Sequence, residues 1–265
     1  MAGVQELHLM GAGGQSTVGW GHLVGPDCPN LTSFHISGLV IQHDMLQCLQ
    51  HCRITHLTLG PNTHMGPHLA PLLSISGHAS PLPSLQHLTV HSSTLYQLVK
   101  HAAPRLRSLH VRDCAVTGPL EVAIEMCEQL EELVLPKGHE AFDDTMELLT
   151  ALPALQHLRL GACFLQLPQP AASQWKTLQV DAMDVETAQY LPQLPGLEML
   201  QLGGLIVPVS STAAETTALL APGMAVLGRL AASGRLQWGT SRANHGAATA
   251  HITLGIHVDE DQAED

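Results

Sequence analysis

Residues 152–163, LPALQHLRLGAC, place apolar side chains at Leu155, Leu158 and Leu160 and a cysteine at Cys163. The stretches LRSLHVRDC (106–114) and ITHLTLGPN (54–62) repeat this spacing. Alternation with a period of two is typical of a short strand, because successive side chains point to opposite faces. The recurrence of one spacing along the chain predicts repeated structural units.

The frame L-x-x-L-x-L can be placed nine times, at steps of 20 to 31 residues. Its middle apolar residues are Leu7, Phe34, Leu57, Leu88, Leu109, Leu133, Leu158, Leu178 and Leu200. Segments of helical period follow some frames, and GPLEVAIEMCEQ (118–129) places Leu120, Ile124 and Cys127 on one helix face. A prolyl residue stands two positions before several frames, where it ends a helix and favours an extended chain.

Over roughly residues 3–206 the frame resembles that of the leucine-rich-repeat family, whose pattern continues to an asparagine or cysteine, here Asn62, Cys114 and Cys163. The resemblance implies an α/β fold, a leucine-rich-repeat solenoid with a concave parallel β-sheet and convex helices. The curved horseshoe shape also follows from spacing, because strands pack more closely than helices. One repeat is too small to bury its own core, so neighbouring repeats must stack.

We expect about nine repeats over 1–206, a divergent C-terminal repeat or cap over 207–258, and a disordered acidic tail over 259–265. Within the cap, 213–234 predicts a helix interrupted near Pro222 and Gly223. The stretch RLQW (235–238) follows it, and then 248–258, which alternates like a strand. The first strand begins close to Met1 without a preceding cap. Either another element covers that edge, or the chain is a part of a larger protein.

Composition argues against several classes of partner. The net charge is -12 and no Lys/Arg cluster occurs, so nucleic acid is not expected as a partner. No apolar run is long enough to cross a bilayer, and the N-terminus does not resemble a secretory signal. We therefore expect a cytoplasmic protein, with axonemal or nuclear locations left open. The six cysteines are expected to be reduced and mostly buried.

The outward positions of the frames form the predicted binding surface for a protein partner. These candidate residues are His8, His35, His56, Thr58, His87, Thr89, His110, Glu132, His157 and Arg159. Imidazoles there can gain charge below about pH 6.5. The alternative is that small polar residues and histidines are merely tolerated on an exposed sheet of a His-rich protein.

Signals for a metal or for catalysis are weak, and we predict no cofactor, no small-molecule substrate and no enzymatic activity. His64 and His68 are spaced i, i+4, as are Cys48 and Cys52, a spacing that puts two ligands on one helix face. The cysteine pair equally fits a core stripe with Met45 and Leu49. The GAGG stretch at 11–14 lacks the lysine of a phosphate-binding loop and is interpreted as a turn.

The sequence thus predicts a non-enzymatic protein-interaction module that binds a partner through the concave sheet. Two alternatives remain open. Cys28 and Cys127, three residues before Leu31 and Leu130, resemble the cysteine-containing repeats of F-box proteins, which implies substrate recognition in a ubiquitin-ligase adaptor whose F-box is not in this sequence. The other is a structural role in a large assembly such as an axoneme.

Overall fold

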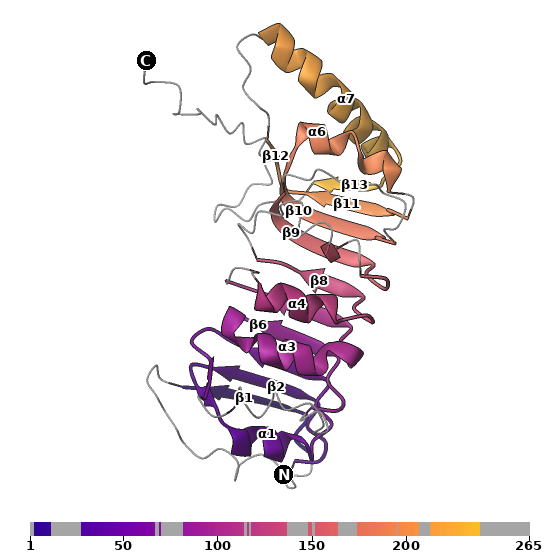
Figure 1. Ribbon diagram of the computed structural model, residues 1–265. Coiled ribbons are helices and arrows are strands. Elements are labelled where there is room, and N and C mark those ends of the chain that lie inside the picture. The colour runs from indigo at the N-terminus through magenta and orange to yellow at the C-terminus, as the bar shows by residue number, and fades with distance from the viewer. Residues whose placement is uncertain are drawn as a thin grey trace, which may run out of the picture. The chain divides into compact units, whose positions relative to one another are not determined.

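The computed structural model describes residues 3–11, 28–66, 69, 82–113, 116, 118–136, 148–149, 152–163, 174–194, 196–206 and 213–238. The chain divides into two compact units. Unit 1 comprises Met1–Pro136 with Leu152–Leu155, and unit 2 comprises Lys137–Ala151 with Gln156–Asp265. Each unit contains its own run of parallel strands, and each is described by itself (Figure 1).

The strands of unit 1 pair in the order in which they occur in the chain. They are β1 (Glu6–Met10), β2 (Ser33–Ser37), β4 (His56–Leu59), β6 (His87–Val90), β7 (Ser108–Val111) and β8 (Glu132–Val134). Every pairing is parallel, and it aligns the middle frame residues with one another, as in Leu57↔Leu88 and Leu88↔Leu109. The predicted strand positions and the predicted fold class are therefore confirmed.

A repeated hydrogen-bond arrangement starts each strand. The carbonyl of Thr55, two residues before the middle frame leucine, accepts hydrogen bonds from the N–H groups of Gln86 and His87 at 3.0 and 2.9 Å. The carbonyls of Gln5, Thr32, Gln86, Arg107, Gln156 and Lys176 do the same for the next repeat. These bonds fix the register between neighbours, because a slip by one residue would turn the apolar side chains outward.

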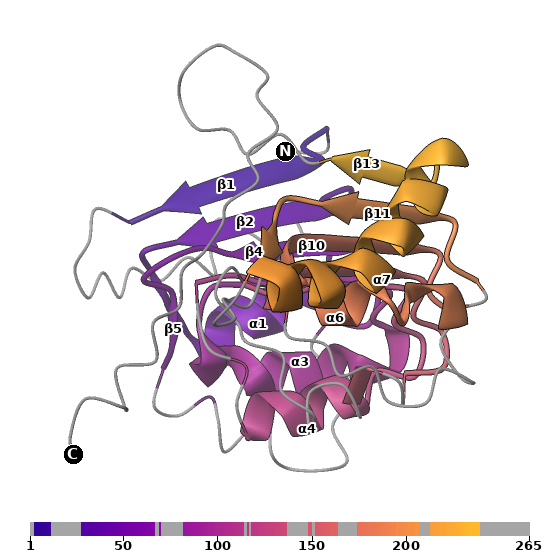
Figure 2. The ribbon, with the colours of Figure 1, turned by 90° about the horizontal axis from the view of Figure 1, so that it is seen from above.

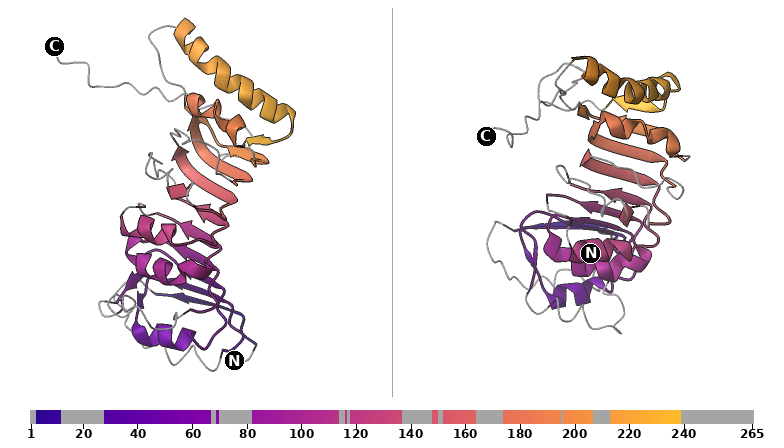
Figure 3. Two further views of the ribbon diagram at one scale, coloured as in Figure 1. Left: turned by 45° about the vertical axis from the view of Figure 1, so that its right-hand side comes forward. Right: turned by 45° about the horizontal axis from the view of Figure 1, so that its top comes forward.

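Helices cover one face of the unit 1 sheet. They are α1 (His43–Leu49), α3 (Tyr96–Ala102) and α4 (Pro119–Glu125), and Figures 2 and 3 show them on the same side of the strands. Short 3-10 turns η2 (Ser93–Leu95) and η3 (Ala103–Arg105) flank α3, and β3 (Val40–Ile41) pairs with β5 (His64–Met65). Helix α4 is shorter than predicted, although Leu120, Ile124 and Cys127 are all buried as its pattern indicated.

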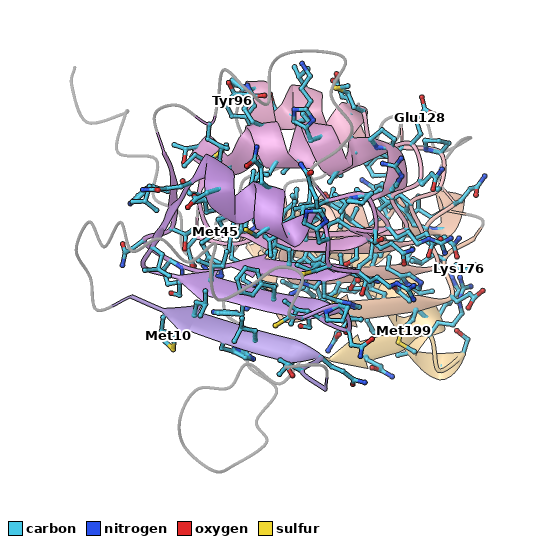
Figure 4. The ribbon with its side chains drawn as sticks, turned by 90° about the horizontal axis from the view of Figure 1, so that it is seen from below. Met10, Met45, Tyr96, Glu128, Lys176 and Met199 are labelled. Atoms are coloured by element: carbon cyan, nitrogen blue, oxygen red, sulfur yellow. The ribbon has the colours of Figure 1, made fainter. Side chains whose placement is uncertain are left out.

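The core of unit 1 lies between these helices and the sheet. Figure 4 shows Met45 of α1 between the helix and the strands, whereas Met10 of β1 points away on the other side of the sheet. Their exposed fractions, 3% and 77%, agree with that placement. The sheet face opposite the helices carries no helix among the described residues, and most of its side chains are half-buried or exposed, with Ser108 an exception.

The turn after β4 differs from the family pattern. Asn62, which occupies the asparagine position of the family frame, is exposed and has a left-handed backbone with φ 57°. The buried polar residue is its neighbour Thr63, whose hydroxyl donates to the carbonyl of Ile36 at 3.3 Å. Asparagine tolerates the left-handed conformation well, so backbone geometry gives a sufficient reason for it here.

Unit 2 repeats the same pattern. Its strands are β9 (His157–Cys163), β10 (Thr177–Asp184), β11 (Met199–Leu202) and β13 (Leu236–Trp238), with β12 (Leu205–Ile206) also paired to β10. Strands β9 and β10 are longer than those of unit 1. Leu158, Leu178, Leu200 and Leu236 lie in register across these parallel strands. The segment at 235–238 is therefore a further strand of the repeat type.

Two helices accompany the unit 2 strands, and the longer one corrects a prediction. Helices α6 (Val185–Ala188) and α7 (Ala213–Ala232) lie side by side (Figure 1), and η5 (Leu191–Gln193) follows α6. Helix α7 is continuous through Pro222, so the predicted interruption near Pro222 and Gly223 is wrong. A helix can retain a proline when the rest of its turns and its packing compensate for the one lost hydrogen bond; here Val226 and Leu227 are buried.

Several predictions fall outside the described residues. These are the strand at 248–258, the acidic tail at 259–265, most of the GAGG stretch, His68 and Cys114. The domain boundaries and the curvature of the whole stack stay predictions.

Candidate functional site

The face of the unit 1 sheet opposite the helices gathers eight of the predicted site residues. They are His8, His35, His56, Thr58, His87, Thr89, His110 and Glu132. We call the outward side chains of β1, β2, β4, β6, β7 and β8 the unit 1 sheet face. None of these eight side chains belongs to the buried core.

Register aligns these side chains into rows across the strands. One row contains Glu6, Ser33, His56, His87, Ser108 and Glu132, and the next contains His8, His35, Thr58, Thr89, His110 and Val134. Side chains directly opposite in neighbouring strands lie close enough to interact. The rows therefore bring together residues from repeats far apart in the chain.

Two pairs of imidazole rings are stacked on this face. The centroids of His56 and His87 lie 4.2 Å apart, with 6° between the ring planes. The centroids of His8 and His35 lie 5.2 Å apart at 23°. Such stacking suits neutral rings, because two protonated imidazoles at this separation would repel each other.

Carboxylates lie beside two imidazoles of the face, His8 and His110. His8 Nε2 lies 2.9 Å from Glu6 Oε1, and His110 Nε2 lies 3.4 Å from Glu132 Oε1. Ser108, which is almost fully buried, donates from its hydroxyl to Glu132 Oε2 at 2.7 Å. These contacts hold the rings and the carboxylates in fixed relative positions.

Burial and neighbouring positive charge both act on the titration of two face histidines. Burial lowers the pKa of His35, and the nearby His8 and His91 lower it further. Burial also lowers the pKa of His87, and His56, His110 and Arg107 add to that effect while Glu132 opposes it. Both rings therefore remain neutral to lower pH than an ordinary histidine.

The remaining two predicted residues, His157 and Arg159, lie on β9 in unit 2. His157 Nδ1 is 2.8 Å from the hydroxyl of Thr177, and Arg159 Nη2 is 4.0 Å from Asp181 Oδ1. Both occupy outward positions of their strand, as predicted. They belong to the unit 2 sheet, and the eight-residue cluster is confined to unit 1.

Sequence reasoning missed two contacts of this face. His91, one residue beyond β6, places its Nδ1 2.9 Å from Asp113 Oδ2, and Asp113 has a left-handed backbone with φ 54°. The hydroxyl of Ser108 also joins Glu132 to His110. The alternating pattern could have indicated Ser108 as a neighbour of Glu132, whereas the turn geometry at Asp113 has no such sequence signal.

Ser108, His110 and Glu132 are the residue types of a catalytic triad, but their arrangement differs from one. In a triad the imidazole lies between the acid and the hydroxyl and uses its two nitrogens separately. Here Ser108 Oγ and Glu132 Oε1 both approach His110 Nε2, and the hydroxyl already donates to the carboxylate. This geometry orients side chains and does not activate the hydroxyl.

The metal candidates are not assembled into a site within the described part of the chain. His64 lies on strand β5, so the helical spacing considered for it is wrong. Cys52 is buried with Met45 and Leu49, in agreement with the core interpretation, whereas Cys48 is only half-buried. No group of three or more potential ligands occurs among the described residues.

The thiol of Cys127 is a buried core group. Burial raises the pKa of Cys127 to about 12, and its thiol donates to the carbonyl of Ala123.

The register and the repeated strand-starting hydrogen bonds define an α/β leucine-rich-repeat-like solenoid. Among the solved structures that this chain resembles is that of a leucine-rich-repeat protein of Leptospira interrogans, at 16% sequence identity and a TM-score of 0.42. The match covers 83% of this chain and 59% of that protein, so the chain spans less than two thirds of its length. No protein-family model and no curated protein matches the sequence. Among the described residues, no helix has the length and apolarity that a membrane span requires.

Proposed function

We propose that the chain is a protein-interaction module that binds a protein partner through the unit 1 sheet face. The single observation that carries the proposal is the division of strands β4 and β6 into a buried apolar side and an outward polar side. In β4 and β6, Leu57, Leu59, Leu88 and Val90 are buried, while every outward side chain is polar and accessible. The core therefore holds a polar surface in place without contributing to it.

A rigid surface binds with a smaller entropic cost than a flexible one, because its side chains are already ordered before the partner arrives. On the unit 1 sheet face that order comes from the register, from the stacked rings and from the contact of Ser108 with Glu132 at 2.7 Å. The same face lacks the charge pattern that a nucleic acid needs, since Glu6 and Glu132 stand at its two ends. A protein surface with its own polar and charged groups is the partner that it fits.

Site-specific photo-crosslinking tests this proposal. A photoreactive phenylalanine derivative is placed at Thr58 or Thr89 on the face, and at Val122, which is 54% exposed on helix α4, as the control. We expect a discrete protein partner to be crosslinked from the two face positions and not from Val122. Crosslinking of the same partner from Val122 alone would move the interface to the helical side.

A further inference from the structure

One row of the unit 1 sheet face has a near-symmetric order of side chains. Reading across the strands, it runs Glu6, Ser33, His56, His87, Ser108 and Glu132. The stacked His56–His87 pair lies at its centre, and a carboxylate stands at each end. With strands about 4.8 Å apart, each end lies roughly two strands, or about 10 Å, from the nearer ring of the pair.

The central pair differs from three other imidazoles on this side of the sheet. His8, His91 and His110 each lie within 3.4 Å of a carboxylate of the chain itself. Among the described residues no carboxylate lies within ion-pair distance of His56 or of His87, although the charge of Glu132 acts on His87 from farther away. Within that part of the chain, His56 Nδ1 lies 2.9 Å from the hydroxyl of Thr55, and the ring of His87 has no hydrogen-bond partner.

Only one carboxylate, that of Glu132, is among the charged groups that act on His87. Glu132, Arg107 and His110 are the charged or titratable neighbours that act on His87, and His56 is its stacking partner. The Glu132 carboxylate is occupied, because Ser108 donates to it and His110 lies beside it. Protonating both stacked rings would place two like charges 4.2 Å apart, a state that an external anion would stabilise.

We propose that the His56–His87 pair is an acid-dependent anchor for a carboxylate side chain of the protein partner. This inference rests on the proposed function of the unit 1 sheet face and names the chemistry that the face recognises. Two parallel imidazolium rings present N–H donors side by side, an arrangement that both oxygens of one carboxylate can accept. Glu6 and Glu132, at the ends of the row, repel a long polyanion, so the anchor fits an isolated Asp or Glu.

Binding of the anion and protonation of the pair are thermodynamically linked. The anion favours the protonated rings, so bound carboxylate raises their proton affinity, and protonation raises the affinity for carboxylate by the same factor. The affinity for carboxylate therefore rises as lower pH protonates the rings. We expect affinity to rise at least about tenfold from pH 7.5 to pH 5.5, since an ordinary imidazole titrates near 6.5 and a glutamate near 4.3. The carboxylate itself stays ionised over that range.

The test uses N-acetyl-glutamic acid α-amide as the probe and its glutamine analogue as the neutral control. Ring signals of the histidines are followed by NMR in the full chain at pH 7.5 and pH 5.5 while the probe is added. The expected result is saturable shifts at His56 and His87, stronger at pH 5.5, with the glutamine analogue inactive. Equal effects of the two compounds would overturn the proposal.

Two variants separate the pair from histidines in general. His56→Gln with His87→Gln should abolish the pH-dependent binding, whereas the exposed His51→Gln, on the turn after α1, should leave it unchanged. The urea midpoints of both variants verify that each is folded. Unaltered binding in the double variant would contradict the proposal, as would tighter binding of inorganic sulfate than of the glutamate probe, which would indicate a general oxyanion site.

The result is independent of the crosslinking test. A partner crosslinked at Thr58 together with a negative probe titration would keep the interface and remove the anchor. If the partner is crosslinked only from Val122 and the probe titration is positive, the proposed interface is wrong. The His56–His87 pair would then still bind a carboxylate, but not one of that partner.

Discussion

The two units use the same inward residues and different outward ones. Leucines aligned in register fill the strand interiors of both, as Leu88 and Leu109 do in unit 1 and Leu158 and Leu178 in unit 2. Outward, unit 1 presents imidazoles and carboxylates, while His157 is the sole histidine among the described residues of unit 2. The repeat therefore determines the backbone in both units, whereas the outward side chains differ between them.

The shared core gives the largest expected effect. Leu109→Asp in unit 1 and Leu158→Asp in unit 2 each place an unpaired charge at a buried position and should cost several kcal/mol of unfolding free energy. Urea denaturation followed by circular dichroism measures the loss. If either variant fails to fold, the loss of unfolding free energy is measured on Leu109→Ala, which should cost about 2–5 kcal/mol. The outward Thr89→Asp is the control, and parental stability in Leu109→Asp would contradict the register.

A glycine follows the third apolar residue of a frame in each unit, where strands approach closely. A Cβ at Gly203 would lie 2.5 Å from the backbone carbonyl oxygen of Asp181, and one at Gly60 would lie 2.9 Å from the Ser37 side chain. Gly203→Ala should cost about 1–3 kcal/mol, and Gly60→Ala less, because its nearest contact lies at 2.9 Å and not at 2.5 Å. Gly228→Ala is the control: it meets open space on α7 and should gain up to about 1 kcal/mol. Thermal denaturation ranks the three, and a loss at Gly228 equal to that at Gly203 would count against the close approach.

Polar contacts on the outward sides of the two sheets should contribute smaller amounts to stability, and unequal ones in the two units. Ser108→Ala removes a donor to Glu132 at an almost fully buried site in unit 1, and should cost about 1 kcal/mol. Thr177→Ala removes the contact with His157 in unit 2, which is solvent-accessible, and should cost less. Urea midpoints of the two variants give the comparison. A larger loss at Thr177 would mean that the Ser108 contact does not order the unit 1 sheet face.

Acid should affect unit 1 through a small decrease in stability. The pKa values of His35 and His87 are lowered in the folded state, so the unfolded chain binds protons first as the pH falls. Their contribution is present above about pH 6.5 and is lost as the pH falls through the folded-state pKa values. In the absence of an anionic ligand, the urea midpoint of the parent chain should decrease from pH 7.5 to pH 5.5. The decrease should be smaller in the double variant that carries both His35→Gln and His87→Gln. An identical decrease in that variant would assign the effect to other groups.

The sequence predicted the inward half of this molecule well and the turns less well. The register of Leu57 with Leu88 follows from the period-two pattern, because a strand with one buried face tolerates no slip. The continuous helix through Pro222 was missed, since local helix propensity argues for a break and tertiary packing of Val226 and Leu227 overrides it. The left-handed residues Asn62 and Asp113 were missed because a turn conformation depends on where the next strand lies.

By itself, the sequence determined which side chains are buried and which point outward, because the alternation of apolar and polar residues leaves only one face for the core. Only the tertiary structure decided which outward residues meet. His56 and His87 are 31 residues apart in the chain, and their rings come to stack at 4.2 Å because parallel pairing places successive repeats side by side. The same pairing leaves neither ring of this pair within ion-pair distance of a carboxylate among the described residues, a property that belongs to the arrangement of strands and to no single repeat.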